Sequence, residues 1–210
     1  MGCETEARPL RHAGCARVEM RDYTIQSRIV AYVALGSNRN GRENVSRAIN
    51  RLSELSSSPF HSSSLWETTP VDCPPGSPNF VNAVVALIPK SGETPESLLK
   101  KLQALEKEFG RVPKKVLNEA RPLDLDLIAF GDERRNGPEL VLPHPRAHKR
   151  RFVLQPLAQL ARDFTLPGQT KTVAQLLDDL APAEKVEEIK RQLNRRMARS
   201  NPRPAVKRRN

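Results

Sequence analysis

Short apolar segments alternate with segments of helical periodicity along the middle of the chain, and their order constrains the fold more than any other feature. The apolar segments are of strand length and rich in β-forming residues, whereas the helical segments place apolar residues three and four positions apart. The order β-α-β-β-α-β predicts an α+β fold, namely a ferredoxin-like sandwich in which a mainly antiparallel sheet is flanked by helices. The predicted strands are Ile29–Leu35, Phe60–Glu67, Phe80–Ile88 and Leu123–Phe130, with a brief extension at Glu139–Leu142, and the predicted helices are Glu43–Leu55, a helix capped by Thr94 and stopped by Gly110, and Arg151–Ala161.

The excess of basic residues lies mostly outside this predicted fold. Among the 210 residues, 35 Lys and Arg against 24 Asp and Glu leave a net charge of +11, which suggests a polyanionic partner: nucleic acid, an acidic membrane surface or a phosphorylated small molecule. Residues 181–210 hold ten of the basic residues against three Glu. We therefore divide the chain into a loose leader over 1–27, a domain over 28–180 and a basic tail over 181–210, disordered or partly helical over Ala183–Ala198.

Several classes of protein are excluded by simple patterns. The apolar runs fall far short of the roughly 18 residues that a membrane-spanning helix needs, and we expect no secretory signal because the first residues lack an apolar run. Cys3, Cys15 and Cys73 are odd in number and widely spaced, so they predict no disulfide framework. Glu6 stands where a myristoylation motif has Ser or Thr. We expect a soluble, cytoplasmic protein that acts as a monomer.

Two aspartates in the last of the four strands are the strongest candidates for chemistry. The alternation of this strand puts leucines 123, 125 and 127 on one face and Asp124, Asp126 and Ile128 on the other. Two carboxylates this close repel one another and form an oxygen-rich site suited to a hard divalent cation such as Mg²⁺. Taken alone, so short a motif is also explained by a solvated strand face paired with Lys or Arg.

Basic residues flank the two aspartates on both sides in the sequence. A nucleoside triphosphate with Mg²⁺ requires such surroundings, because positive side chains hold the phosphate oxygens while the metal neutralises charge. Neither G-x-x-x-x-G-K-[ST] nor G-x-G-x-x-G occurs, so side chains must hold the phosphates. By itself, such a cluster is equally typical of an ordinary solvated surface. The basic residues are Arg111, Lys114, Lys115 and Arg121 upstream, and His144, Arg146, His148, Lys149, Arg150 and Arg151 downstream.

An ordered series of motifs resembles the hydroxymethyldihydropterin pyrophosphokinase family, whose members move the pyrophosphoryl group of ATP onto a pterin alcohol in folate biosynthesis. Each motif is short, but all of them occur in the family's order between about Ile29 and Leu180. The resemblance implies the ferredoxin-like fold and this transfer reaction, with ATP and a reduced pterin as substrates. The motifs are Val33–Asn38, Thr68–Pro70, Phe80–Ala83, Gly110–Arg111, Arg121–Leu127 and Leu142–Arg146.

The resemblance also implies a role for individual residues. Asp124 and Asp126 would bind two Mg²⁺ ions that bridge the triphosphate, and residues 111–122 would form a loop that closes over the substrates. The residues implied to contact the phosphates or the nucleotide of ATP are Arg111, Arg121, His144 and Arg150, and those implied to lie near the nucleoside are Glu106 and Leu127. The pterin ring would be sandwiched by Phe80 and Phe152 and bound at its edge by Asn82, Thr68, Pro70 and Val71. Together with the two aspartates, Arg111 and Arg121 would be catalytic.

Some positions depart from the family pattern. Pro113 and the stretch Leu117–Ala120 stand where members often carry arginines, and Phe80 stands where a tyrosine is common. The lost arginines make a relative with impaired catalysis an alternative, recognisable by ATP-dependent pterin binding without AMP formation. A second alternative is a nucleic-acid-binding module that uses the basic tail, although the predicted strands lack the aromatic pattern of an RNA-recognition domain.

Overall fold

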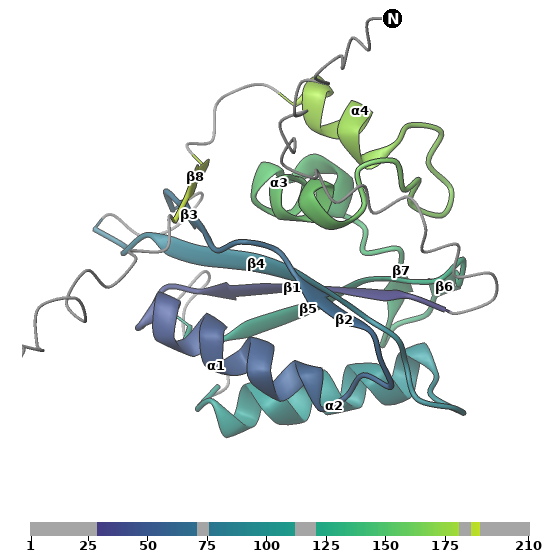
Figure 1. Ribbon diagram of the computed structural model, residues 1–210, viewed down its shortest axis with the longest axis horizontal. Coiled ribbons are helices and arrows are strands. Elements are labelled where there is room, and N and C mark those ends of the chain that lie inside the picture. The colour runs from purple at the N-terminus through teal and green to yellow at the C-terminus, as the bar shows by residue number, and fades with distance from the viewer. Residues whose placement is uncertain (1–28, 71–75, 112–120, 181–185, 190–210) are drawn as a thin grey trace, which may run out of the picture.

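The computed structural model describes residues 29–70, 76–111, 121–180 and 186–189, and its centre is one antiparallel sheet (Figure 1). The sheet has the order β5-β1-β4-β3-β8, with β2 paired to β4 as well. Strand β1 therefore lies between β4 and β5, as the first strand does in a ferredoxin-like sandwich, which confirms the predicted fold class. The strands are β1 (Ala31–Ser37), β2 (Phe60–Ser62), β3 (Trp66–Thr68), β4 (Phe80–Leu87), β5 (Asp124–Phe130) and β8 (Val186–Glu188), and a separate hairpin joins β6 (Arg135–Asn136) to β7 (Val141–Leu142).

Helices cover both faces of the sheet (Figure 1). Helices α1 (Gly41–Ser53) and α2 (Pro95–Glu108) lie on one face, and α3 (Arg151–Leu160) and α4 (Val173–Asp179) lie on the other. Each layer encloses its own apolar core, because side chains alternate between the two faces along every strand. None of the described helices is long and apolar enough to cross a membrane.

The strand expected over Phe60–Glu67 is two strands, so this prediction is wrong in detail. Strands β2 and β3 both pair with β4 but are separated by residues 63–65. At the break, the backbone N–H of Ser63 donates to the Val84 carbonyl, and the Ser63 hydroxyl accepts from the Val84 N–H. A side chain thus replaces one rung of the ladder, and the chain bends between the two strands.

The alternation in β5 ends at a β-bulge. Tyr32 and Val33 of β1 pair with Ala129 and Leu127, which leaves Ile128 as an extra residue. Ile128 and Ala129 therefore both lie in the core beneath α3 and α4, whereas Phe130 returns to the core beneath α1 and α2. The predicted separation of the leucines from the aspartates holds as far as the bulge.

Helix α4 and strand β8 were not predicted from the sequence. Helix α4 begins at a capping box, in which the Thr172 hydroxyl and the Gln175 side chain each accept from the other's backbone N–H; a Thr followed three residues later by Gln is the sequence pattern of such a cap. The sequence predicts a basic tail over 181–210 that is disordered or partly helical over Ala183–Ala198, whereas Val186–Glu188 is strand β8. It pairs with the edge strand β3, a partner that sequence periodicity does not show.

Candidate active site

The register of the sheet places the predicted polar residues in rows on one face. Gly36 of β1 pairs with Asn82 of β4 on one side and with Asp124 of β5 on the other. Two residues along, Ala34 likewise pairs with Asp126. Because paired residues of antiparallel strands point to the same face, Asn82 and both aspartates lie on the face covered by α3. In these two rows the middle strand β1 contributes only Gly36 and Ala34. No side chain larger than a methyl group therefore separates the β4 residues from Asp124 and Asp126.

Two arginines bind Asp124. The distance from Arg121 Nη1 to Asp124 Oδ1 is 2.7 Å, and the distance from Arg111 Nη1 to the same oxygen is 3.2 Å. Arg111 follows α2 and also forms an ion pair with Glu106 of that helix. The two guanidinium groups therefore meet at one carboxylate, where they present fixed positive charge beside the aspartate pair.

Glu106 is a buried carboxyl that ties α2 to the aspartate strand. It is 3% exposed, and its Oε1 accepts a hydrogen bond of 2.8 Å from the backbone N–H of Leu125. Burial, with a contribution from Asp124, raises the pKa of Glu106 to about 7, although the Leu125 hydrogen bond and Arg111 act in the opposite direction. This hydrogen bond holds the C-terminal end of α2, and with it Arg111, next to Leu125, the residue between the two aspartates.

Asp126 faces His144. The distance from His144 Nε2 to Asp126 Oδ2 is 4.0 Å, and the His144 backbone N–H donates to the Ile128 carbonyl. Burial and then repulsion from Asp124 raise the pKa of Asp126 above its ordinary value, against the attraction of His144, Arg150 and Arg121. Burial lowers the pKa of His144, against the attraction of Asp126. His144 Nδ1 accepts from the backbone N–H at 146, so a neutral ring carries its proton on Nε2, towards Asp126.

Residues after β1 hold Arg121 in place. The Asn38 side-chain oxygen accepts from the Arg121 N–H at 2.7 Å, and the Asn38 N–H donates to the Arg121 carbonyl at 3.3 Å. The side-chain amide of Asn44 in α1 donates to the Pro122 carbonyl at 3.1 Å. The sequence singled out Ser37 and Asn38 only as part of a motif. The positioning role of Asn38 follows from a contact between positions 83 residues apart, which sequence spacing does not show.

The residues predicted to bind a flat ring lie on the same face, at the β3 side. Thr68 pairs with Phe80, and the Asn82 side-chain amide donates a buried hydrogen bond of 2.8 Å to the Thr68 hydroxyl. Phe80 and Phe152 are both half-buried, and the Arg150 guanidinium lies 5.3 Å from the centre of the Phe152 ring. Half-buried Pro70 follows β3, whereas Val71 lies outside the described residues.

A cavity of about 260 Å³ lies next to Asp126 and His144. It is formed between α2, β5 and the segment that contains β7, and it combines apolar walls with Asp126, Glu139 and His144, as small-molecule sites commonly combine apolar walls with a few polar groups. Leu127, whose side chain is otherwise part of the core, lines it. The lining residues are Leu99, Leu125, Asp126, Leu127, Pro138, Glu139, Leu140, Val141, His144 and Pro145.

The aspartate pair fits a Mg²⁺ ion that is shared with substrate phosphates. Among the described residues, no cluster of three or more His, Cys, Asp or Glu side chains forms a complete protein metal site. Mg²⁺, however, is usually held by one or two carboxylates together with phosphate oxygens and water. Burial and repulsion from Asp124 raise the pKa of Asp126, and a divalent cation bound at the pair would favour its charged form.

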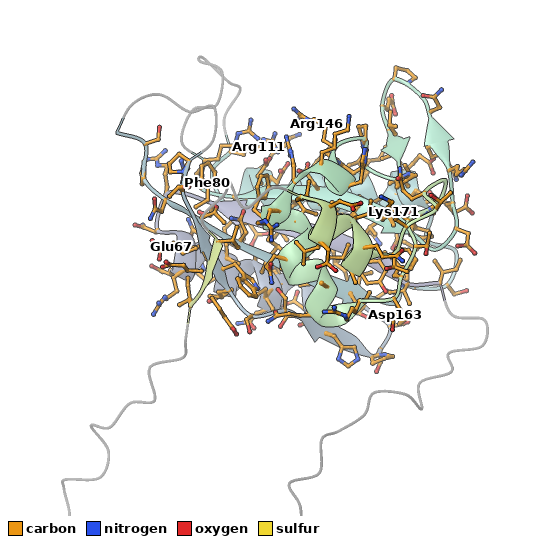
Figure 2. The ribbon with its side chains drawn as sticks, turned by 90° about the horizontal axis from the view of Figure 1, so that it is seen from above. Glu67, Phe80, Arg111, Arg146, Asp163 and Lys171 are labelled. Atoms are coloured by element: carbon orange, nitrogen blue, oxygen red, sulfur yellow. The ribbon has the colours of Figure 1, made fainter. Side chains whose placement is uncertain are left out.

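The structure brings together, from separate elements, residues that the sequence predicts to contact ATP. Figure 2 shows Phe80, Arg111 and Arg146 along one rim of the molecule, away from Asp163 and Lys171. The predicted closing loop over 111–122 falls largely on residues 112–120, which lie outside the described residues. The residues brought into one charged cluster are Glu106, Arg111, Arg121, Asp124, Asp126, His144 and Arg150.

Comparison with known proteins identifies the family of this chain. The family model described as 7,8-dihydro-6-hydroxymethylpterin-pyrophosphokinase matches residues 32–162, which span β1 to α3 and include nearly all of the site. The chain belongs to this pyrophosphokinase family. Strand β8 and helix α4 lie beyond the matched residues.

Curated relatives in the pyrophosphokinase family match most of the chain. A Haemophilus influenzae protein named 2-amino-4-hydroxy-6-hydroxymethyldihydropteridine pyrophosphokinase is 37% identical over 155 residues, which cover 71% of this chain and 94% of the relative. A Pseudomonas aeruginosa protein of the same name is 41% identical over 138 residues, covering 65% of this chain and 83% of the relative.

Solved structures support the fold. A Plasmodium falciparum HPPK-DHPS structure with pteroate has a TM-score of 0.56 and 13% identity, covering 72% of this chain and 42% of that one. An HPPK-DHPS structure in complex with substrates has a TM-score of 0.56 and 11% identity, covering 72% of this chain and 43% of that one. This chain thus spans less than half the length of these two structures, and at such identity the likeness concerns the fold alone.

Proposed function

We propose that the chain transfers the pyrophosphoryl group of ATP to 6-hydroxymethyl-7,8-dihydropterin, giving AMP and the pterin diphosphate, in folate biosynthesis. The observation that carries this proposal is the row Asn82–Gly36–Asp124, which sets an amide and a carboxylate on either side of a glycine. A flat ring bound by Asn82 would have its substituent directed towards the aspartates. The pyrophosphokinase names of the curated relatives agree with this reaction.

The pterin would bind between β4 and α3. Phe80 and Phe152 would stack on the two faces of the ring, each contact adding about 0.5–1.5 kcal/mol beyond area burial. Asn82, fixed by Thr68, would hydrogen-bond the ring edge together with backbone near Pro70 and Val71. Thr68 accepts the Asn82 amide N–H, so the amide oxygen stays available to accept from the pterin.

The triphosphate would lie over the aspartate pair. Arg111, Arg121, His144 and Arg150 would hold its oxygens by charge-assisted hydrogen bonds. Asp124 and Asp126 would hold two Mg²⁺ ions, which when bound supply neutralisation of phosphate charge. We assign the nucleoside to the cavity lined by Leu127, with Glu106 setting the adjacent end of α2.

The chain's own residues would act mainly by positioning and electrostatics. The hydroxymethyl oxygen forms a bond to the β-phosphorus and loses its proton, while the bond between that phosphorus and the oxygen bridging to the α-phosphorus breaks and AMP leaves with the bonding electrons. Arg111 and Arg121, already aligned at Asp124, would stabilise charge on the phosphoryl oxygens during transfer.

The direct test is product identity. Purified protein with ATP, Mg²⁺ and the reduced pterin alcohol is expected to form AMP and not ADP, measured by separation of the nucleotides. Omitting the pterin is the control for simple hydrolysis. ADP as the product would contradict the proposal, and pterin binding without AMP would identify a family member with impaired catalysis, consistent with the departures at Pro113 and Leu117–Ala120.

Replacing Gly36 by alanine is expected to weaken pterin binding selectively. A Cβ atom at this position would lie 3.1 Å from the Asn82 side-chain oxygen, too close for an unchanged amide. Loss of one well-placed hydrogen bond corresponds to a pterin KM about tenfold higher, with the ATP KM unchanged. Gly137→Ala is the matched control, because the new Cβ would meet only the Leu140 carbonyl at 3.8 Å. Equal changes in both KM values would argue against this role of Gly36.

A further inference from the structure

Strand β8 lies outside the matched family region but is next to the proposed pterin site. The family match ends at residue 162, whereas β8 begins at Val186. It pairs with β3 in the register Val186 to Thr68, Glu67 to Glu187 and Trp66 to Glu188. It therefore covers the outer edge of a strand whose inner edge is held by β4.

Strand β3 alone is a short support for the residue that fixes Asn82. It has three residues, Trp66–Thr68, and follows the break that separates it from β2. The Thr68 hydroxyl accepts the buried Asn82 amide at 2.8 Å, so any displacement of Thr68 also frees Asn82. Strands this short are only weakly stable without partners on both edges.

The hydrogen bonds of β8 go to the centre of β3. The Ile189 N–H donates to the Leu65 carbonyl at 2.8 Å. Hydrogen-bonded and non-hydrogen-bonded pairs alternate along an antiparallel ladder, so Glu67–Glu187 is the next bonded pair. Glu67 thus bonds outwards to β8, while Thr68 and Trp66 bond inwards to β4. The backbone N–H of Glu188 points away from β3.

Side-chain packing joins β8 to the rest of the site. Ile189 packs against the core beneath α1 and α2, as does Leu65. On the other face β8 contacts α3, the helix that carries Phe152. The strand is therefore anchored on both faces of the sheet, next to β3 and to α3, the elements that carry the Thr68 support and one ring-stacking residue.

We infer that β8 is a positioning element for the pterin: by pairing with Glu67 it holds β3 in register, so that Thr68 fixes the Asn82 amide for ring recognition. The inference rests on the proposed function, because it assigns the pterin to Asn82. It extends the working site beyond the residues that match the family. It places the effect on pterin affinity rather than on the phosphate chemistry.

Three full-length variants isolate the backbone bond. Glu187→Pro removes the N–H that donates to β3, whereas Glu188→Pro makes the same change of residue where the N–H points away, a position that tolerates proline on an edge strand. Glu187→Ala removes the side chain but keeps the N–H. We expect Glu187→Pro to raise the pterin KM about tenfold, the effect of one lost hydrogen bond, with the ATP KM and kcat unchanged. The two controls should match the parent protein.

Amide hydrogen exchange provides a second measurement that needs no substrate. The peptide covering residues 65–70 should exchange faster in Glu187→Pro than in Glu188→Pro, because losing the hydrogen bond from the Glu187 N–H to the Glu67 carbonyl loosens the pairing in which the Glu67 N–H donates to the carbonyl of residue 187. A lower kcat with both KM values unchanged would indicate a purely structural role and would overturn the inference. Equal effects of the two proline variants on the pterin KM, or hydrogen exchange that is unchanged in Glu187→Pro, would overturn it as well. If the parent protein forms no AMP, the proposed function fails. Equal hydrogen exchange in the two proline variants would separately refute the inference that β8 holds β3 in register.

Discussion

Replacing Asp126 by alanine is expected to lower the rate of AMP formation by about 10³-fold, because a lost metal ligand removes several kcal/mol of charge stabilisation in the transition state. Asp126 has a raised pKa through burial and repulsion from Asp124, so its charge is unfavourable in the free protein. A group kept at such a cost to stability is typical of a functional site. The rate is measured with saturating ATP and pterin and with Mg²⁺ titrated.

The controls separate chemistry from folding. Asp126→Asn keeps the shape but not the charge and should lose nearly as much rate as the alanine variant. Asp163→Ala removes an exposed aspartate that Figure 2 places away from the site, and it should retain full activity. The midpoint of thermal unfolding should not fall in either Asp126 variant, because relief of the buried charge offsets lost contacts. A rate within tenfold of the parent protein in Asp126→Ala would refute the metal assignment.

Phe130→Ala is expected to have the largest effect on stability. Phe130 is 2% exposed, at the end of β5, and packs in the core beneath α1 and α2. Truncating a buried phenylalanine costs about 3–5 kcal/mol, which at about 2–4 °C per kcal/mol lowers the unfolding midpoint by roughly 6–20 °C. Calorimetry or urea titration would measure the loss.

Phe60→Ala is the matched control for this change. Phe60 packs against the same core but is half-buried, so its truncation leaves a smaller cavity and should cost clearly less stability. Below its unfolding transition, Phe130→Ala should keep both KM values, because Phe130 lies at the far end of β5 from Asp124. An unfolding midpoint within about 2 °C of the parent protein would show that the core repacks around the loss.

The order of elements was predictable because it depends on local periodicity. Short apolar segments predicted β1, β4 and β5, the last with alternating side chains, and local helical patterns predicted α1, α2 and α3, all within a few residues of their observed bounds. The breaks were not predictable in this way. The division between β2 and β3 depends on Ser63 binding a strand that is distant in sequence, and the bulge at Ile128 depends on the register with β1.

Part of the site was equally predictable. Asp124 and Asp126 share a face because neighbouring side chains alternate in any strand, and their flanking basic residues are visible in the chain. The positioning residues were less visible. Asn38 positions Arg121 by hydrogen bonds, and Glu106 contacts the Leu125 N–H and Arg111; these contacts join separate elements.

The sequence by itself determined the α+β class, the aspartate pair and the motifs that resemble a family, because these depend on residues close together in the chain. Only the tertiary structure decided that Gly36 lies between Asn82 and Asp124, and that β8 covers β3. Register and strand order arise from long-range pairing, whose free energy is shared among many weak contacts across the sheet. For that reason local patterns identified the chemical groups, and the fold alone set the distances between them.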